Sequence, residues 1–477
     1  MTYDVFVIGG GINGCGIAAD AALRGLSVIL CEQDDLASYT SSYSSKLIHG
    51  GLRYLEYYEF NLVRKALHER ERLLKLAPHL IHPLPTLLPH NKHLRPSWMI
   101  RLGLILYDLL AGKHSMPRST FLRLNSSNTS LKPDYTKGYL YYDGAVDDSR
   151  LVVANALQAQ QHGAEIHTQS KVIRATRVHN LWEIAVTHAD TTTVYQAKTL
   201  VNAAGPWVNN IITDVCHDEA KHHVRLVKGS HIVVPKPSSY QEQNAYILQL
   251  ADQRIIFVIP YFEQFLLIGT TDVDYQDDPA KASISMTERD YLLKNVNDYF
   301  TWQLTAANIV HAFAGVRPLV ADEHANASSV TRDYKIEVHA VNQQTPVVHI
   351  FGGKITTYRK LSEEVVNLLR PYFPNLPYSK TATAPLPGGD IANMQNFIAQ
   401  VQRDFLQLPE AMVKRMAHAY GTRIYQLLEG VSTIADLGMD YGHSLYQREI
   451  DFLKNTEWAT SMEDILWRRT KLGLCNT

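Results

Sequence analysis

The chain has 477 residues, more than one hydrophobic core usually accommodates, so two or three domains are expected. Its 46 basic and 47 acidic residues leave a net charge of −1, which gives no electrostatic reason to expect a nucleic-acid partner. The 4 cysteines are scattered without a C-x-x-C pair, which argues against a disulfide framework, a zinc site or an iron–sulfur cluster and fits a reducing compartment. We expect no metal site.

The chain opens with the pattern of a βαβ unit. Residues 3–8 form an apolar, β-branched run that is typical of a buried parallel strand. Apolar residues at helical spacing follow until Gly25, and a second apolar run at 26–31 ends at the acidic Glu32. We therefore expect a strand, a helix and a second parallel strand.

Three glycines join the first strand to the helix in the G-x-G-x-x-G pattern. Gly9 permits a tight turn, Gly11 lets the backbone approach a pyrophosphate, and Gly14 lets the helix pack closely on the sheet. Glu32 falls near the offset at which an acid accepts hydrogen bonds from a ribose hydroxyl. This context indicates an adenine-dinucleotide site, and the fingerprint alone does not choose between FAD and NAD.

A hydroxyl-rich loop at 40–46 runs into the sequence KLIHGGLRY at 46–54. Hydroxyls and amides suit a pyrophosphate and ribityl chain, although a solvated loop has a similar composition. Residues 3–54 resemble the FAD-dependent, quinone-reducing glycerol-3-phosphate dehydrogenases. Later motifs that match the family extend the resemblance over most of the chain: KGSH at 228–231, GTTD at 269–272, GVRP at 315–318 and GGKITT at 352–357.

Further elements are expected in chain order. An exposed helix covers 57–76, prolines over 78–96 end the first domain, and a helix runs from Asp147 to His162. A helix over 288–300, capped by Thr287 and Asp290, covers an antiparallel sheet. Strands are expected at 164–168, 171–176, 182–187, 199–207, 229–234, 245–248, 255–259, 265–270 and 347–351.

The expected fold class is α/β, with a discontinuous Rossmann-like FAD-binding domain, a substrate or cap domain built on a mixed or antiparallel sheet, and a C-terminal α-helical domain. The FAD-binding domain would comprise 1–85, 143–220 and 318–370, and the cap domain 86–142 and 221–317. Residues 385–477 would form the helical domain, in which Trp467–Lys471 is a clear local pattern.

The glycine motifs and the resemblance together predict the residues that contact FAD. Lys354 and the helix N-terminus that follows it would also stabilise the negative charge on the reduced flavin. The predicted contacts are Gly9, Gly11, Asn13, Gly14, Glu32, Thr40, Ser41, Ser42, Ser45, Lys46, Leu47, His49, Gly50, Gly51, Val172, Ala204, Gly205, Trp207, Gly353, Lys354 and Thr356.

The resemblance implies that sn-glycerol 3-phosphate is oxidised to dihydroxyacetone phosphate, with hydride transfer to flavin N5. Arginine forks match phosphate oxygens, so Arg53, Arg317 and Arg332 are the candidates for binding the phosphate. Tyr54 and Thr270 could bond other substrate oxygens. A histidine is the expected base, and the sequence does not rank His49 against His231. Arg317 and Lys354 complete the predicted catalytic set.

Residues 98–110 form the most apolar stretch, interrupted by Arg101 and Asp108. It is too short and too charged to span a bilayer. Composition alone favours a buried core helix, whereas the resemblance favours a helix lying in a membrane interface, because a quinone reductase must reach its acceptor. Its basic flanks are Lys92, Arg95, Lys113 and Arg118.

The resemblance further implies ubiquinone or a related quinone as acceptor, a homodimer, and peripheral attachment at the cytoplasmic face of the cell membrane. The first strand leaves no room for a signal or transit peptide before it. Three alternatives remain: a glycerol-3-phosphate oxidase that reduces oxygen, an amine or amino-acid oxidase of the same fold, and a dinucleotide-binding sensor without turnover. Such a sensor would not need the arginine motifs.

Overall fold

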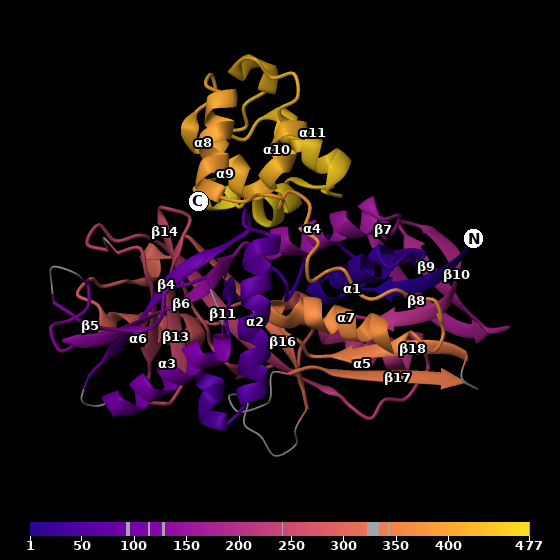
Figure 1. Cartoon of the computed structure of the whole chain (residues 1–477), viewed down its shortest axis with the longest axis horizontal. Helices are drawn as coiled ribbons and strands as arrows, with labels where there is room; N and C mark the ends of the chain where they lie inside the picture. Colours follow the sequence, from indigo (N-terminus) through magenta and orange to yellow (C-terminus); the bar gives the residue numbers. More distant parts are fainter. Residues whose placement is uncertain are drawn as a thin grey trace.

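The computed structural model describes residues 1–91, 96–112, 115–125, 129–240, 242–321, 333–341 and 344–476. Two β-sheets lie side by side, and the helices of the C-terminal part lie above them in Figure 1. Each part has its own cluster of buried apolar side chains.

The first sheet has the order β17-β18-β10-β1-β2-β7. The strands β18, β10, β1, β2 and β7 run parallel, β17 is antiparallel, and β8 and β9 extend from β10 as an antiparallel pair. The predicted βαβ opening is confirmed. The bounds are β1 Thr2–Ile8, β2 Val28–Cys31, β7 Glu165–His167, β8 Ser170–Val178, β9 Leu181–His188, β10 Thr191–Asn202, β17 Lys335–Val341 and β18 Gln344–Phe351.

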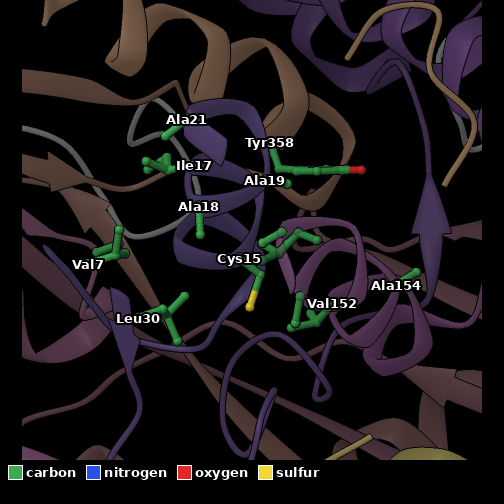
Figure 2. Packing of buried hydrophobic residues seen from close by; sticks show 14 of the residues in the cluster. Val7, Cys15, Ile17, Ala18, Ala19, Ala21, Leu30, Val152, Ala154 and Tyr358 are labelled. Carbon is green, nitrogen blue, oxygen red and sulfur yellow. The ribbon is translucent and has the colours of Figure 1, made fainter. Parts of the chain in front are cut away.

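Helix α1 (Ile12–Leu23) packs between the first sheet and two helices, α4 (Asp148–Gln161) and α7 (Tyr358–Leu368). Figure 2 shows Cys15 and Ala18 of α1 among Val7, Leu30 and Val152 from the neighbouring elements. Small side chains on α1 permit this close approach. Asp147 caps α4 by accepting a hydrogen bond from the amide of Arg150, as expected.

The second sheet has the order β15-β11-β14-β13-β12-β4-β6-β3, with β16 paired to β11 and β5 paired to β6. Its pairings are antiparallel except for β12 with β4. The bounds are β3 Leu47–Ile48, β4 Ile81–His90, β5 Thr120–Arg123, β6 Lys137–Val146, β11 Val224–Pro235, β12 Ala245–Gln249, β13 Ile255–Tyr261, β14 Phe265–Gly269, β15 Val273–Asp274 and β16 His311–Val320.

The boundaries expected near 85 and 143 fall inside β4 and β6, two strands of this second sheet. The division into domains stays a prediction. Helix α6 (Met286–Tyr299) covers the sheet, but the expected cap at Thr287 and Asp290 is wrong. Ser285 and Glu288 form a complete capping box instead, because a serine followed three residues later by glutamate satisfies both end amides.

Helix α2 (Phe60–Leu76) was expected to be exposed, and this is wrong. Its apolar face is buried, and so are Glu69 and Arg70, whose charges are paired inside the fold. Arg70 bonds Asp143, and Glu69 bonds Arg359 of α7. The many charged residues of α2 suggest an exposed helix, but several of them are buried because they are paired.

The C-terminal part is helical, as expected, and follows a long connection after α7. It has a core of its own, centred on α9 and α11. A π-helical segment at Asp464–Arg469 closes it against the first sheet's loops. The remaining helices are α3 Ser97–Ala111, α5 Val208–Asn210, α8 Met394–Asp404, α9 Glu410–Tyr420, α10 Ile424–Leu427 and α11 Gln447–Thr456, with short 3₁₀ turns that include η1 at Leu52–Tyr57.

Candidate active site

A cavity of about 1120 Å³ lies where the loops of the first sheet meet β11, β13 and β16 of the second sheet. The glycine turn after β1 forms one part of its wall, and Arg317 and His231 form another. The dinucleotide motif and the candidate substrate residues therefore share one cavity.

The turn after β1 brings bare backbone to the cavity wall. Gly9 has φ +108°, and an added Cβ there would lie 2.7 Å from the carbonyl oxygen of Ala203. Gly14 is not in the wall; its missing Cβ would lie 1.9 Å from the carbonyl oxygen of Gly9. Gly14 thus allows α1 to approach the turn, as its place in the motif predicts.

Glu32 lies in the cavity wall at the end of β2. Its carboxylate accepts hydrogen bonds from the amides of Gly10, at 2.6 Å, and Asp34, at 3.0 Å. Burial raises the pKa of Glu32 to about 7, against the opposing effect of these two amides. A ribose hydroxyl at this position would be a further donor to the carboxylate.

The hydroxyl-rich loop divides into residues that face the cavity and residues that hold the loop. Thr40, Ser41, Ser45 and Leu47 line the cavity. Ser41 Oγ also accepts a hydrogen bond from the first amide of α1, Ile12 N, at 3.0 Å. The loop therefore closes over the N-terminus of α1.

Three other predicted cofactor contacts do not line the cavity. The ammonium of Lys46 is buried against Asp148, at 2.8 Å, and the carbonyl oxygen of Ser42, also at 2.8 Å. The Ser42 hydroxyl donates to the carbonyl of Tyr39, and the amide of Gly50 donates to Tyr107 Oη. These residues shape the loop from behind rather than touching the space in front of it.

The last part of the cofactor-side wall comes from the segments after β10 and β18. Asn13 Nδ2 donates to the carbonyl of Gly352 at 3.2 Å, whereas its Oδ1 is buried without a partner among the described residues. Thr356 Oγ1 accepts a hydrogen bond from the amide of His49 at 3.2 Å. The predicted contacts Gly11, Gly51, Val172, Ala204, Gly205, Trp207, Gly353 and Lys354 also line the cavity.

Arg317, on β16, lies in the part of the cavity wall that the second sheet forms, and two side chains bind its guanidinium. Its guanidinium donates to Thr270 Oγ1 at 2.7 Å and pairs with Asp272. Gly229 on β11 leaves room for it, because a Cβ there would lie 2.0 Å from Arg317 Nη2. The sequence names Asp272 only as part of the GTTD motif, and its role in orienting Arg317 becomes visible in the fold, which brings the two residues together.

Two more predicted cations reach the same cavity. The Lys354 ammonium lies 3.8 Å from the centre of the Tyr54 ring, and Arg53 Nη2 donates to Tyr57 Oη at 3.3 Å. Both basic residues line the cavity, as does Tyr54. Arg332 lies outside the described residues.

The two candidate bases have different surroundings. His231 is buried, its Nε2 lies 2.9 Å from Ser45 Oγ, and its ring stacks on Phe313 with a centroid separation of 5.0 Å. Burial, and next the charges of Arg317 and Lys46, hold the pKa of His231 well below its ordinary value. His49 is half-buried and meets Phe257 edge to face.

A group of potential metal ligands, Asp218, His339 and His349, lies at the far edge of the first sheet. Asn202 Nδ2 also donates to the carbonyl of Val208, and it lies 3.2 Å from His349 Nδ1. The other ring nitrogen, Nε2, lies 4.0 Å from Asp218. His349 Nε2 is buried and makes no hydrogen bond among the described residues, and no metal site is proposed there.

Two family models match the chain. Residues 4–358 match the FAD-dependent oxidoreductase family, and residues 379–477 match the C-terminal domain of α-glycerophosphate oxidase. The chain is 53% identical to the glycerol-3-phosphate dehydrogenase of Pseudomonas aeruginosa over 99% of this chain and 92% of that protein. It is 47% identical to the aerobic glycerol-3-phosphate dehydrogenase of Escherichia coli, over 99% and 94%.

A further relative is D-erythritol 1-phosphate dehydrogenase of Brucella abortus, 45% identical over 98% of this chain and 94% of that protein. The crystal structure of glycerol-3-phosphate dehydrogenase from Bacillus halodurans, complexed with FAD, matches 99% of this chain and 86% of that chain with a TM-score of 0.77 and 28% identity. Mycoplasma pneumoniae L-α-glycerophosphate oxidase shares the fold, with a TM-score of 0.62 and 21% identity over 78% of this chain and 95% of that one.

The residues of the cavity fit FAD, which is the cofactor of this enzyme. The unpartnered Asn13 Oδ1 can accept a hydrogen bond from it, and the turn at Gly9 leaves no side chain in the way. The carboxylate of Glu32 suits its ribose. The sequence, the fold and the cavity agree that the chain belongs to the family of FAD-dependent glycerol-3-phosphate dehydrogenases.

Proposed function

We propose that the protein oxidises sn-glycerol 3-phosphate to dihydroxyacetone phosphate and passes the electrons to a membrane quinone. The observation that supports this best is the convergence of Arg317, Lys354 and Arg53 on the cavity that also contains the dinucleotide turn. An anionic substrate would then be held beside the cofactor rather than at a separate site.

Arg317 is the proposed anchor of the substrate phosphate. Thr270 and Asp272 fix its guanidinium from the side of the second sheet, so little rotational freedom remains to be lost on binding. The planar fork then meets two phosphate oxygens. Lys354 adds a second positive charge. Its ammonium is positioned by the cation–π contact with the ring of Tyr54.

Bound FAD supplies the hydride acceptor, and the protein must orient the substrate and remove the hydroxyl proton. We assign proton removal to His231 at Nε2, the nitrogen beside Ser45 Oγ. Burial, and next the positive charges of Arg317 and Lys46, lower the pKa of His231 and keep its imidazole neutral and hence able to accept a proton. His49, whose amide is bonded to Thr356, would instead shape the adjoining wall.

Helix α3 is the proposed contact with the membrane. Ile100, Leu104 and Tyr107 face the interior. On the opposite face Trp98, Leu102 and Leu109 are 66%, 58% and 70% exposed. Such an outward apolar face suits a bilayer interface and brings the enzyme to its quinone. None of the described helices combines the length and apolar character needed to span a bilayer.

Tyr57 of η1, which packs against α3, and the following Tyr58 are also exposed, as is Phe121 of β5. Of the predicted basic flank, Arg118 is exposed, and Lys92, Arg95 and Lys113 lie outside the described residues. The homodimer and the cytoplasmic face of the membrane stay predictions from the resemblance.

The test is anaerobic bleaching of the flavin by sn-glycerol 3-phosphate, with glycerol and D-erythritol 1-phosphate as matched comparisons. We expect fast bleaching by sn-glycerol 3-phosphate and none by glycerol, because the phosphate provides the binding contacts with Arg317 and Lys354. Faster bleaching by D-erythritol 1-phosphate would replace the proposed substrate with the longer polyol phosphate, which the similarity to the Brucella enzyme makes the second candidate.

The acceptor is tested by returning electrons from the reduced enzyme to a soluble quinone or to air. We expect fast reoxidation by the quinone alone. Equally fast reoxidation in air would make the protein an oxidase.

A further inference from the structure

The segment Trp467–Lys471 of the C-terminal part approaches the active site from outside the cavity. None of its residues lines the cavity. Its arginines are nevertheless buried, and both bond Asp35 in the loop after β2: Arg468 Nε at 2.6 Å and Arg469 Nη2 at 2.7 Å. The segment is therefore bound to the cofactor-side loops rather than only to its own helices.

One chain of contacts leads from Lys471 to His231. The buried Lys471 ammonium bonds the side chains of Asp147 and Ser149 at the start of α4, on either side of Asp148. The fully buried Asp148 holds the Lys46 ammonium at 2.8 Å and the Ser44 hydroxyl at 2.7 Å.

Ser45 lies between Ser44 and Lys46, and its hydroxyl is 2.9 Å from His231 Nε2. Lys46 has φ +55°, a conformation that few non-glycine residues adopt, so the loop depends on these contacts to keep its shape. Asp148 thus fixes the hydroxyl that faces His231.

A second chain of contacts reaches the other side of His231. Trp467 stacks on His311 of β16, with ring centroids 4.1 Å apart and planes at 18°. His311 and Phe313 alternate along β16 and lie on the same face, 6.1 Å apart. Phe313 in turn stacks on His231 at 5.0 Å. Trp467 therefore supports the ring against which His231 rests.

We propose that Trp467–Lys471 is a positioning element for His231, acting through Lys471 on the loop that contains Ser45 and through Trp467 on Phe313. This proposal rests on the proposed function, in which His231 accepts the substrate proton. The segment touches neither cofactor nor substrate. The C-terminal part of the chain is thereby a component of the active site's geometry.

The experiment compares holoenzymes carrying Trp467→Leu, Trp467→Phe, Lys471→Met and, as control, Arg415→Met. Arg415 is half-buried and pairs with the fully buried Glu449 within the C-terminal part. Trp467→Phe keeps an aromatic ring over His311. It therefore still gives a readable result at position 467 if Trp467→Leu does not fold. Each variant is examined by hydrogen–deuterium exchange of residues 40–47 and by rapid mixing with saturating sn-glycerol 3-phosphate across pH.

We expect faster exchange at 40–47 in Lys471→Met, and flavin reduction slowed by about tenfold in Trp467→Leu and Lys471→Met, because a slightly misplaced base loses rate steeply. Trp467→Phe and Arg415→Met should resemble the unmodified enzyme. FAD content should not change. The half-maximal pH of reduction should rise in Lys471→Met, since loosening the loop moves Lys46 away from His231.

The charged groups that face His231 are Lys46 from the loop, Arg317 from β16, and Asp272, paired with Arg317, after β14. Only Lys46 belongs to the loop that the Lys471 variant loosens. Two results would overturn the positioning role. One is an unchanged exchange rate at 40–47 and an unchanged rate of flavin reduction in both Trp467→Leu and Lys471→Met. The other is a rate of flavin reduction that falls as much in Arg415→Met as in Lys471→Met. If the unmodified enzyme is not reduced by the substrate, the proposed function fails, while the exchange data still decide the link to the loop.

Discussion

The cofactor end and the substrate end of the cavity are built from different parts of the chain. At Gly9 and Gly11 the wall is backbone, and the decisive feature is the absence of side chains. At Arg317 and His231 the wall is side chains held by other side chains, among them Thr270 and Ser45. The cofactor end lets the ligand approach the backbone closely, and the substrate end holds side chains in a fixed orientation toward the substrate.

This difference implies different failures on mutation. Added atoms should damage the cofactor end through clashes and leave little folded holoenzyme. Changes at the substrate end should leave the cofactor bound and alter how the substrate is held.

The first prediction concerns Gly14→Ala, whose Cβ would lie 1.9 Å from the carbonyl oxygen of Gly9. Moving α1 away from the turn should cost about 1–3 kcal/mol of stability or more and abolish FAD retention. The measurements are thermal unfolding and flavin content. Gly103→Ala on α3 is the control, because nothing lies within 4 Å of its added Cβ. A Gly14→Ala protein that purifies with full flavin would contradict the account.

Gly229→Ala is the matched change at the substrate end. Its Cβ would lie 2.0 Å from Arg317 Nη2 and 2.6 Å from Thr270 Oγ1, which forces the guanidinium to move. KM for sn-glycerol 3-phosphate should rise by about tenfold or more with FAD still bound. Steady-state kinetics with a soluble quinone provide the measurement, and Gly103→Ala in α3 is again the control, because nothing lies within 4 Å of its added Cβ. An unchanged KM would show that Arg317 does not hold the phosphate.

The exposed face of α3 lies apart from both ends. Leu102→Glu combined with Leu109→Glu should lower binding to lipid vesicles by about tenfold or more, because two exposed apolar side chains become charged. Activity with a soluble quinone should stay unchanged. Leu406→Glu, at an equally exposed site of the C-terminal part, tests whether any exposed apolar residue would do. Equal vesicle binding of all three proteins would remove the membrane assignment.

The smallest effect is a pH dependence at Glu32 in the FAD-free protein. Its pKa, raised by burial to about 7, means that folding favours the protonated carboxyl. The stabilisation is present at pH 4 and is lost as pH rises through 7. Glu32→Gln, which stays neutral, should therefore gain in Tm relative to the unmodified protein between pH 5 and pH 8, by on the order of a few degrees. A Tm difference independent of pH would contradict this.

The same contrast explains how much the sequence could predict. The turn at Gly9, helix α1 and strand β2 are local in sequence, and the pattern predicted them correctly. Lys46 was predicted to touch the cofactor because it ends the hydroxyl-rich loop at 40–46. Only the fold shows that Asp148, far along the chain, binds its ammonium.

The second sheet was harder to predict for a related reason. The motifs named Arg317 and His231, but nothing local shows that β16 pairs with β11, or that Gly229 leaves space for Arg317. The burial of α2 was missed because Glu69 and Arg70 find partners on distant elements. Side-chain partnerships between distant segments are the part that one sequence does not reveal.

The most direct test of the central claim, that one cavity has a cofactor end and a substrate end, is an anaerobic titration of the flavin in Arg317→Ala with sn-glycerol 3-phosphate. The account predicts full FAD content and an unchanged oxidised flavin spectrum. It also predicts that far more substrate is needed for bleaching than in the unmodified enzyme. Loss of FAD, or bleaching at the same substrate concentration, would contradict it.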